Sequence, residues 1–399
     1  MNIKQDQFQY DTNHQAIMRI GLDFSSLDQA TPKGGQYRYV VNLVRGLSEL
    51  NQDKFQFFLF GSNSEPVPEL QDIFLAYPEQ WVYRQIKPWN FRGGYYLNYL
   101  RYAAIAYFYR LHLWHTLHSF IPLLASCKII ITEYDLMYEL FDEYQEAVCS
   151  RPYQINKWGV QNRVDHVITI SESTTNDLEQ RWEIPIEKIS TVQLGANLPN
   201  LNALVNSKTL KLEKEIVELT LLSPFNLEPR KNLHSLLLVM PQLLTQYPSL
   251  RLILFGRAAC TPEREREFNN LISELNIKDQ VICMGFVEDE RLAELYYHCT
   301  VFVFPSLYEG FGLPILEAMS MGACVVARNA ASMAEIVSNT GVLIENCDPD
   351  ELTLAISKLL ENEPMRRKLS EAAKERAKDF SIQNMASKTL KVYEEILVK

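Results

Sequence analysis

The sequence has no surplus of positive charge. Its 399 residues carry 39 Lys and Arg against 49 Asp and Glu, a formal net charge of −10 at pH 7. Broad, sequence-independent binding of nucleic acid depends on a positive surplus, so we expect no nucleic-acid partner. Glycine is also scarce, with 15 residues, which excludes collagen-like and low-complexity architectures. Apolar residues nevertheless make up 47% of the chain, which is enough for packed cores and argues against intrinsic disorder.

Paired cysteines and long apolar runs are missing as well. The seven cysteines form no C-x-x-C pair, which is typical of small buried side chains in a reduced compartment rather than of a disulfide or zinc framework. Residues 1–15 lack the apolar segment of a signal peptide, and no apolar run reaches the ~18 residues of a transmembrane helix. We therefore expect a cytoplasmic protein, with a peripheral contact to a membrane left open.

Strand and helix patterns alternate along the whole chain. An apolar run at 17–23 predicts a buried strand, and apolar residues recur at helical spacing over 40–47. The same alternation restarts near residue 219, after a polar connection at 199–214. We predict an α/β fold of two Rossmann-like, doubly wound domains facing across a cleft. Their expected bounds are 1–205 and 206–399, and the last helix could pack back on the first domain.

The most informative motif spans residues 304–317, F-P-S-L-Y-E-G-F-G-L-P-I-L-E. A strand followed by a glycine-containing loop leads to Pro314, which suits the first turn of a helix. Free backbone amides at such a helix start favour an anion. The carboxylates of Glu309 and Glu317 would accept hydrogen bonds from hydroxyls, so a sugar phosphate satisfies both features. The alternative is that Glu309 is a loop charge and Glu317 only complements the helix dipole.

Two cations stand together in a second motif, E-P-R-K-N at 228–232. We expect Arg230 and Lys231 at the start of an amphipathic helix, where cations oppose the helix dipole at a cost of ~0.3–1 kcal/mol. Unless Glu228 compensates, this position favours a bound anion such as a diphosphate, which suits a bidentate Arg and a point-charge Lys. A solvated, charged helix start is the alternative.

Two features of the first half also remain open. Gly34 and Gly35 lie between the first strand and the first helix, where they would either admit a ligand close to the backbone or form a plain turn, which we favour without further context. The segment 89–114 is rich in Tyr and Arg. It is either a helix packed on the first sheet, which we favour, or an interfacial helix that touches lipid or a lipid-linked acceptor.

Two patterns resemble metal sites. His112, His115 and His118 recur every third residue, but their stretch is typical of a strand entering a loop, so we favour one histidine facing an acceptor. Asp348-Pro349-Asp350 precedes a helical pattern and is interpreted as a cap. No metal site is expected.

The motifs together resemble those of the retaining glycosyltransferases of family four, which have the GT-B fold. Glu309 and Glu317 are separated by seven residues, as are the paired glutamates of the family. The first half matches more loosely, through Gly34-Gly35 and V-I-T-I-S-E-S at 167–173. The matching pieces of the second half are E-P-R-K-N (228–232), L-I-L-F-G (252–256), M-G-F-V (284–287) and P-S-L-Y-E-G-F-G-L-P-I-L-E-A-M-S-M-G (305–322).

The resemblance implies a role for each matching residue. Arg230 and Lys231 would neutralise the donor's diphosphate as the sugar–phosphate bond breaks, without an obligatory metal and with no cofactor. Glu309 would hold the hydroxyls of the transferred sugar. The implied donor-binding residues are Gly34 and Gly35 at the phosphates, Phe286 and Val287 at the base, Gly310, Phe311, Gly312 and Leu313 at the sugar and phosphate, and Glu317 at the ribose.

The acceptor side departs from the family pattern. Many members carry His-Asp after the strand that here covers 129–133, whereas this chain has Tyr134-Asp135. Tyr134 can hydrogen-bond, but it does not titrate near neutral pH as histidine does. Tyr134, Asp135 and His118 are the candidate acceptor-side residues.

The implied function is that of a retaining hexosyltransferase. It would move a sugar from a nucleotide diphosphate sugar to a glycan or lipid-linked acceptor in polysaccharide or glycoconjugate biosynthesis, with GDP-mannose favoured over a UDP-sugar. One alternative is a GT-B epimerase or hydrolase of sugar nucleotides, which would need a cluster of acid and base residues in the cleft. Another is a donor-binding pseudo-glycosyltransferase that acts as an assembly partner, an alternative that Tyr134 keeps open.

Overall fold

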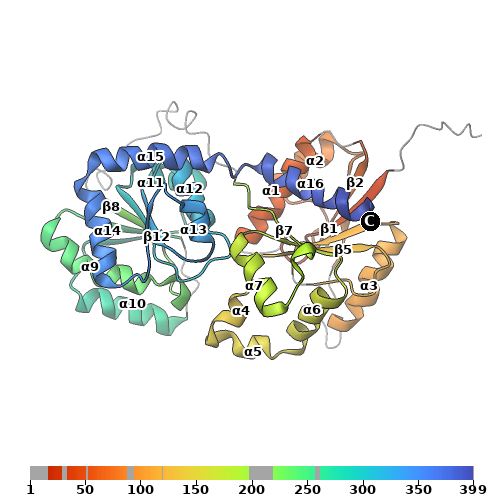
Figure 1. The fold of residues 1–399 in the computed structure, drawn as a ribbon, viewed down its shortest axis with the longest axis horizontal. Coiled ribbons are helices and arrows are strands. Elements are labelled where there is room, and N and C mark those ends of the chain that lie inside the picture. The colour runs from red at the N-terminus through yellow and green to blue at the C-terminus, as the bar shows by residue number, and fades with distance from the viewer. Residues whose placement is uncertain are drawn as a thin grey trace, which may run out of the picture. The chain divides into compact units, whose positions relative to one another are not determined.

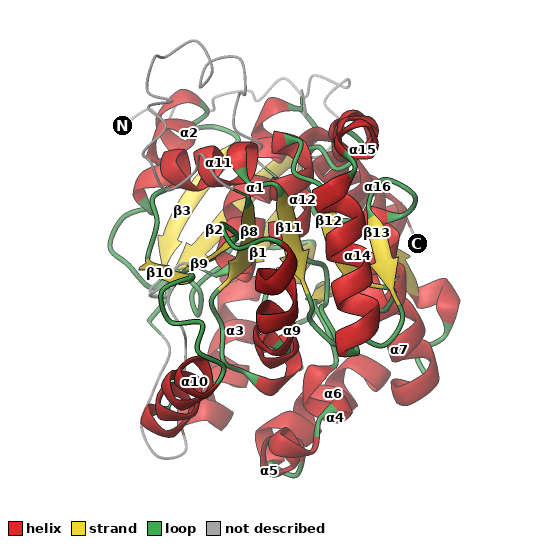
Figure 2. Ribbon diagram, turned by 90° about the vertical axis from the view of Figure 1, so that its left-hand side faces the viewer, coloured by secondary structure: helices red, strands yellow, loops and turns green. Residues whose placement is uncertain are grey.

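The computed structural model describes residues 17–28, 34–50, 53–87, 94–118, 120–196, 219–256 and 261–398. They contain two β-sheets with helices packed around them (Figures 1 and 2). Every strand pair with a described register is parallel. The predicted α/β class with two doubly wound sheets is confirmed.

The first sheet has seven strands in the order β3-β2-β1-β4-β5-β6-β7. The chain adds strands to one side of β1 and then returns to add the others beyond β4, so the direction of winding switches between β1 and β4. The strands are β1 (Met18–Asp23), β2 (Phe55–Gly61), β3 (Trp81–Gln85), β4 (Leu113–Thr116), β5 (Lys128–Glu133), β6 (His166–Thr169) and β7 (Ile189–Thr191).

Helices connect these strands, as parallel pairing requires. Ser171 caps the start of α7, since its Oγ accepts a hydrogen bond from the Thr174 amide. The helices of this half are α1 (Gly35–Glu49), α2 (Gln71–Ala76), α3 (Gly94–Phe108), α4 (Met137–Leu140), α5 (Gln145–Val148), α6 (Arg151–Asn162) and α7 (Glu172–Trp182), with short 3₁₀ turns η1 (Pro68–Leu70), η2 (Asp142–Tyr144) and η3 (Ile186–Lys188).

The second sheet has six strands in the order β10-β9-β8-β11-β12-β13. Here the winding switches between β8 and β11. Figure 2 shows strands of this sheet side by side. They are β8 (Thr220–Pro224), β9 (Arg251–Phe255), β10 (Val281–Gly285), β11 (Val301–Phe304), β12 (Val325–Arg328) and β13 (Val342–Ile344).

One helix of the second half, α9 (Leu233–Gln246), buries the apolar face expected of the amphipathic helix after the E-P-R-K-N motif. Along α9, the side chains of Leu233, Leu236, Leu237, Met240 and Leu243 are all buried in one core with strands β8, β9 and β11. Asp348 caps α14, as interpreted from the sequence, by accepting a hydrogen bond from the Glu351 amide. The helices are α9 (Leu233–Gln246), α10 (Pro262–Glu274), α11 (Asp289–His298), α12 (Leu313–Met321), α13 (Ala331–Val337), α14 (Pro349–Glu361), α15 (Glu363–Ala377) and α16 (Ile382–Val398), with the turn η5 (Pro229–Lys231).

The contacts divide the chain into two compact units. The first comprises Met1–Thr132, Trp158–Val167 and Leu390–Lys399, and the second comprises Glu133–Lys157 and Ile168–Thr389. The predicted boundary between 205 and 206, with the connection at 199–214, falls outside the described residues and stays a prediction. Among the described helices, none has the length and apolar character needed to cross a bilayer.

A buried polar network ties the end of α16 into the first unit. The two ring nitrogens of His115 lie 2.7 Å from the Tyr393 hydroxyl and 2.8 Å from the Thr132 hydroxyl, and Tyr39 reaches the same threonine at 3.1 Å. Burial lowers the pKa of His115 to about 3, so its ring is neutral. His115 therefore has a structural role here. Of the other histidines in this stretch, His112 accepts a hydrogen bond from the Arg19 amide.

Candidate functional site

The candidate site lies where the second sheet changes its direction of winding. In doubly wound sheets, ligands bind beyond the carboxyl ends of the strands at such a switch point. The segment 225–232 follows β8, and the segment 305–312 follows β11, the neighbouring strand. Both sequence motifs therefore reach the same edge of the sheet. Hydrogen bonds join the two segments directly, from the Leu307 amide to the Arg230 carbonyl (2.7 Å) and from Asn232 Nδ2 to the Pro305 carbonyl (3.2 Å).

The segment after β11 presents a run of backbone amides. Gly312 has φ 107°, a left-handed conformation that favours glycine, and α12 begins directly after it. The Ser332 hydroxyl holds the loop by donating to the carbonyls of Glu309 (2.8 Å) and Phe311 (2.5 Å). The amides of Gly310, Phe311, Gly312 and Leu313 find no acceptor anywhere in the described part of the chain. Such a run at a helix start is an anion-binding arrangement.

A compact charge cluster adjoins these amides. Lys231 Nζ lies 2.7 Å from Glu309 Oε1 and 2.9 Å from Oε2, and Arg230 Nη1 lies 3.4 Å from Oε2. Glu309 is buried. Burial alone would lower the pKa of Arg230, but the nearby carboxylates of Glu309 and Glu228 raise it above its ordinary value. The cluster therefore keeps its guanidinium charged.

The local structure of the two cations differs from the expectation. Arg230 and Lys231 belong to the 3₁₀ turn η5, and α9 begins only at Leu233, after Asn232 in a left-handed conformation. Glu228 also supplies the compensation that the sequence left open, since its Oε2 lies 2.9 Å from Arg230 Nε. Both of these buried atoms nevertheless lack a well-aligned hydrogen bond. The positive charges of the pair are thus matched by two carboxylates, and no uncompensated cation pair exists.

The segment after β5 reaches the same cluster. A Cβ atom on Gly310 would collide with the Tyr134 carbonyl, so this close approach requires glycine at 310. Asp135 accepts a hydrogen bond from the Met137 amide. Burial raises the pKa of Asp135, and the neighbouring Arg230 opposes that rise. The structure therefore brings Tyr134 and Asp135 together with Arg230, Glu309 and Gly310.

Glu133 is a buried carboxylate that the sequence interpretation did not single out. Its Oε1 atom is buried and has no hydrogen-bond partner among the described residues. Burial raises its pKa to about 8, with a smaller contribution from the charge of Asp135. At neutral pH this side chain is therefore mostly protonated.

The remaining predicted donor residues of the second unit come from the segments that follow β10 and β11. Glu317 accepts a hydrogen bond from the Tyr296 hydroxyl at 3.2 Å. Phe286 and Val287 directly follow β10, and the Phe286 ring is 68% exposed. A large ring exposed at a strand end is an available stacking surface.

Gly34, Gly35 and His118 lie in the first unit, so the structure does not place them relative to the charge cluster. Gly34 precedes α1 with φ −83°, and a Cβ atom there would meet nothing within 4 Å. The fold itself therefore does not require glycine at 34. His118 follows β4 and is half-buried, and burial lowers its pKa. Within the described ranges, no three His, Cys, Asp or Glu side chains are grouped as metal ligands.

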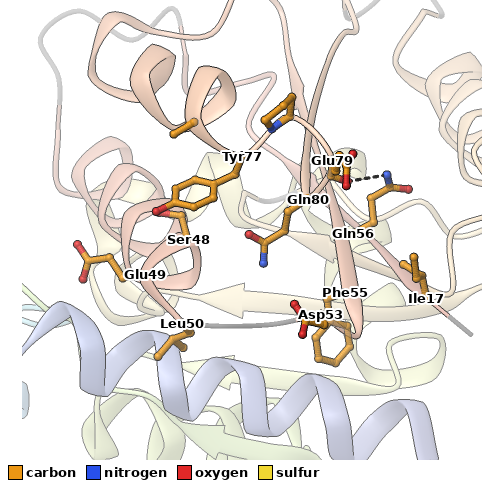
Figure 3. A pocket seen from close by; sticks show the side chains of 12 residues that line it. Ile17, Ser48, Glu49, Leu50, Asp53, Phe55, Gln56, Tyr77, Glu79 and Gln80 are labelled. Carbon is orange, nitrogen blue, oxygen red and sulfur yellow. Dashed lines mark hydrogen bonds between the residues drawn. The ribbon is translucent and has the colours of Figure 1, made fainter. Parts of the chain in front are cut away.

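A hollow of about 640 Å³ lies in the first unit, at the amino ends of the strands of the first sheet (Figure 3). Ile17, Phe55 and Gln80 line it, directly before or at the start of β1, β2 and β3. Since doubly wound sheets bind ligands at the carboxyl ends of their strands, this amino-end hollow is not the candidate site.

Several residues that shape the site were missed by the sequence analysis. Ser332 stands near the start of a helix, where a serine is ordinarily interpreted as a cap. Tyr296 is a buried helix residue whose spacing shows no polar role. Tyr308 supports the loop by donating to Asp177 Oδ2 at 2.7 Å. Glu228 was not missed, since its place in the E-P-R-K-N motif already indicated it as compensation for the two cations.

Comparison with protein families agrees with this arrangement. Residues 210–376 match the model described as glycosyl transferases group 1, and residues 33–198 match glycosyltransferase family 4. One relative is the serotype-specific mannosyltransferase WbdA of Escherichia coli, which is 28% identical over 255 residues, covering 62% of this chain and 31% of that protein. The chain spans less than a third of the length of the first curated relatives it matches.

Solved structures share the fold. Sucrose-phosphate synthase from Thermosynechococcus elongatus matches 96% of this chain and 99% of its own with a TM-score of 0.75 at 21% identity. HepE from Anabaena, solved with UDP-glucose, matches 95% of this chain and all of its own with a TM-score of 0.70 at 17% identity. The fold and the switch-point site define a GT-B protein. With both halves matched by family models, the chain belongs to the group 1 glycosyltransferases, with a family-four N-terminal half.

Proposed function

We propose that this chain transfers a sugar from a nucleotide diphosphate sugar to a glycan or lipid-linked acceptor, with retention of the anomeric configuration. One observation carries the proposal. Arg230 and Lys231 lie against Glu309 at the switch point, beside four backbone amides that have no acceptor in the described chain. A diphosphate needs cations and amide donors, and a sugar needs hydroxyl acceptors, so the donor fits both halves of this arrangement.

The charges of the site suit the departure of a diphosphate. Negative charge develops on the leaving phosphate oxygens as the bond to the sugar breaks, and fixed donors that meet this charge lower the barrier. Arg230, Lys231 and the amides of residues 310–313 would supply those donors. Glu309, held by both cations, would orient the sugar hydroxyls. We propose that these fixed cationic and amide donors make a metal dispensable, so transfer should persist in a chelator.

The donor base and sugar are further parts of the proposal. Phe286 and Val287 would flank the base, and Glu317 would accept hydrogen bonds from the ribose. The name of the relative WbdA supports a mannosyl donor, and GDP-mannose is therefore favoured over a UDP-sugar. Retention is inferred from the resemblance to family four. HepE was solved with UDP-glucose, but its likeness to this chain, at 17% identity, concerns the fold.

The test is to measure nucleotide release from a panel of GDP-, UDP- and ADP-sugars, with and without glycan or lipid-linked acceptors. The proposal expects release that depends on an acceptor, with a product whose new linkage keeps the donor's anomeric configuration by NMR. Release without any acceptor would instead favour a hydrolase. Tight donor binding without turnover, for every acceptor, would favour a pseudo-enzyme and contradict the transfer reaction.

A further inference from the structure

One stretch of the chain is free of acidic residues. Asp and Glu average one residue in eight across the sequence, but residues 80–132 contain none and hold six Lys and Arg. This stretch belongs to the first unit. A basic segment of this length within a chain of net charge −10 is a local feature, and it indicates a partner of negative charge.

The helix α3 lies within this stretch and is apolar on two faces. Its inner face packs on the first sheet, where the centroids of the Tyr102 and Trp114 rings lie 5.4 Å apart. Its outer face carries four large apolar side chains at helical spacing, with exposed fractions of 42% for Leu97, 59% for Leu100, 78% for Tyr107 and 76% for Phe108. A helix on the surface of a water-soluble domain ordinarily presents polar side chains outward.

Cations border this outer face. Arg101 donates to the Lys87 carbonyl, which places Lys87 beside the middle of the helix. Arg84 lies 5.8 Å above the Tyr109 ring, next to the end of the helix, and Arg110 follows that end and is exposed. None of Arg84, Lys87 and Arg110 forms an ion pair with a described carboxylate. Together with the four apolar side chains, these three residues define the α3 surface.

We propose that the α3 surface docks onto an anionic lipid bilayer. Aromatic and aliphatic side chains enter the boundary between head groups and acyl chains, while bordering Lys and Arg contact the anionic head groups. With 15 residues, α3 lies along the membrane plane rather than across it. This inference does not depend on the transfer reaction, since it rests on the exposure and charge of the first unit alone.

Charge favours a lipid over a second copy of the chain. A symmetric pairing of two α3 surfaces would set the same cations against one another, and like charges in contact repel. An anionic bilayer instead offers apolar depth and negative charge together. The two occupants therefore make opposite predictions for the lipid-free protein, which the experiment below uses.

The experiment is flotation of the purified full chain with vesicles. One set consists of phosphatidylcholine alone and the other of phosphatidylcholine with phosphatidylglycerol. We expect binding to the anionic vesicles, weaker binding to the neutral ones, and loss of binding as salt is raised. The Tyr107→Ser, Phe108→Ser double variant should bind anionic vesicles at least about ten-fold more weakly, as should Lys87→Glu, Arg110→Glu.

The matched control removes equally exposed apolar side chains elsewhere. Leu75 on α2 is 82% exposed and Leu354 on α14 is 71% exposed, so Leu75→Ser, Leu354→Ser should float like the wild type. All variants should keep the wild-type melting temperature. Absence of wild-type binding, or unchanged binding by Tyr107→Ser, Phe108→Ser, would overturn the proposal. A lipid-free dimer that this variant dissociates, seen by analytical ultracentrifugation, would also overturn it in favour of a contact between copies.

Discussion

The ammonium of Lys231 contacts both carboxylate oxygens of Glu309, at 2.7 Å and 2.9 Å. The two residues come from segments that follow different strands, β8 and β11, so this ion pair fastens the two segments across the switch point. The same contact holds a cation next to the amides that follow Glu309, which have no acceptor among the described residues. A change at either residue should therefore affect both the proposed reaction and the packing of the two segments.

Replacement of the cations should slow turnover. Arg230→Ala or Lys231→Ala should each lower kcat by ~10²-fold or more, as for loss of one donor to a developing negative charge. The measurement is initial-rate nucleotide release with the donor found in the panel. Because Lys231→Ala leaves Glu309 without its main partner, the melting temperature of each variant should be recorded as well.

The control for these variants is Arg367→Ala. Arg367 also pairs with a glutamate, Glu363, at 3.0 Å, but both side chains are exposed on α15. An exposed pair of this kind contributes little to stability, so rate and melting temperature should stay at wild-type values. Wild-type rates for both Arg230→Ala and Lys231→Ala would show that these cations do not face the leaving group.

Loss of the Glu317 carboxylate should weaken nucleotide binding. Glu317→Ala removes the proposed acceptor for the ribose hydroxyls, and we expect about ten-fold weaker binding by calorimetry. Tyr296→Phe is the matched comparison, since it removes only the hydroxyl that Glu317 accepts from. It should affect binding less than Glu317→Ala does. Equal affinity of Glu317→Ala and wild type would reject the ribose role.

Replacement of Gly34 by alanine should weaken donor binding without lowering the stability of the fold. Since a Cβ atom on Gly34 would meet nothing and its φ is an ordinary −83°, Gly34→Ala should leave the melting temperature unchanged or slightly raised. If Gly34 lies against the donor phosphates, the same variant should raise KM for the donor by about ten-fold. A wild-type KM would mean that the glycine forms only a turn.

Glu133 should make stability depend on pH. Its pKa is raised from 4.5 to about 8 by burial, so the folded state binds a proton that the unfolded state has lost between these values. The stability from the protonated carboxyl is complete below about pH 4.5 and is lost as the pH rises through 8. Between pH 5 and pH 9, the free energy of unfolding of the wild type should therefore fall by roughly 2–4 kcal/mol more than that of Glu133→Gln. Chemical denaturation at each pH measures this difference. A parallel decline in both proteins would assign the pH dependence to other groups.

The sequence predicted the elements of the fold better than the partners within the site. Alternating patterns give β1, α9 and β11 because apolar spacing directly reflects which faces are buried. That the segments after β8 and β11 adjoin depends on strand order in the sheet, which local pattern does not contain. Only the resemblance to family four, which implies that both motifs bind one donor, indicated that the two segments lie together. The sequence left open whether Glu228 or a bound anion compensates Arg230, because these two arrangements differ only in the direction of the side chains.

Tertiary contacts between residues that are distant in the sequence could not be predicted from the spacing of residue types. Ser332 holds the loop at Glu309 and Phe311 from a helix that follows another strand. The hydrogen bond between Tyr296 and Glu317 joins two helices. Glu133, whose Oε1 has no partner among the described residues, ends an apolar strand, where a charged residue is ordinarily taken to mark the return to solvent.

Calorimetric titration of GDP, UDP and ADP into the wild type and into the Arg230→Ala, Lys231→Ala double variant tests the central claim most directly. The account predicts that at least one of these diphosphates binds the wild type and binds the double variant at least ten-fold more weakly, with the variant still folded. Equal affinity of the two proteins, or no binding of any diphosphate to the wild type, would contradict a diphosphate site at the switch point of the second sheet.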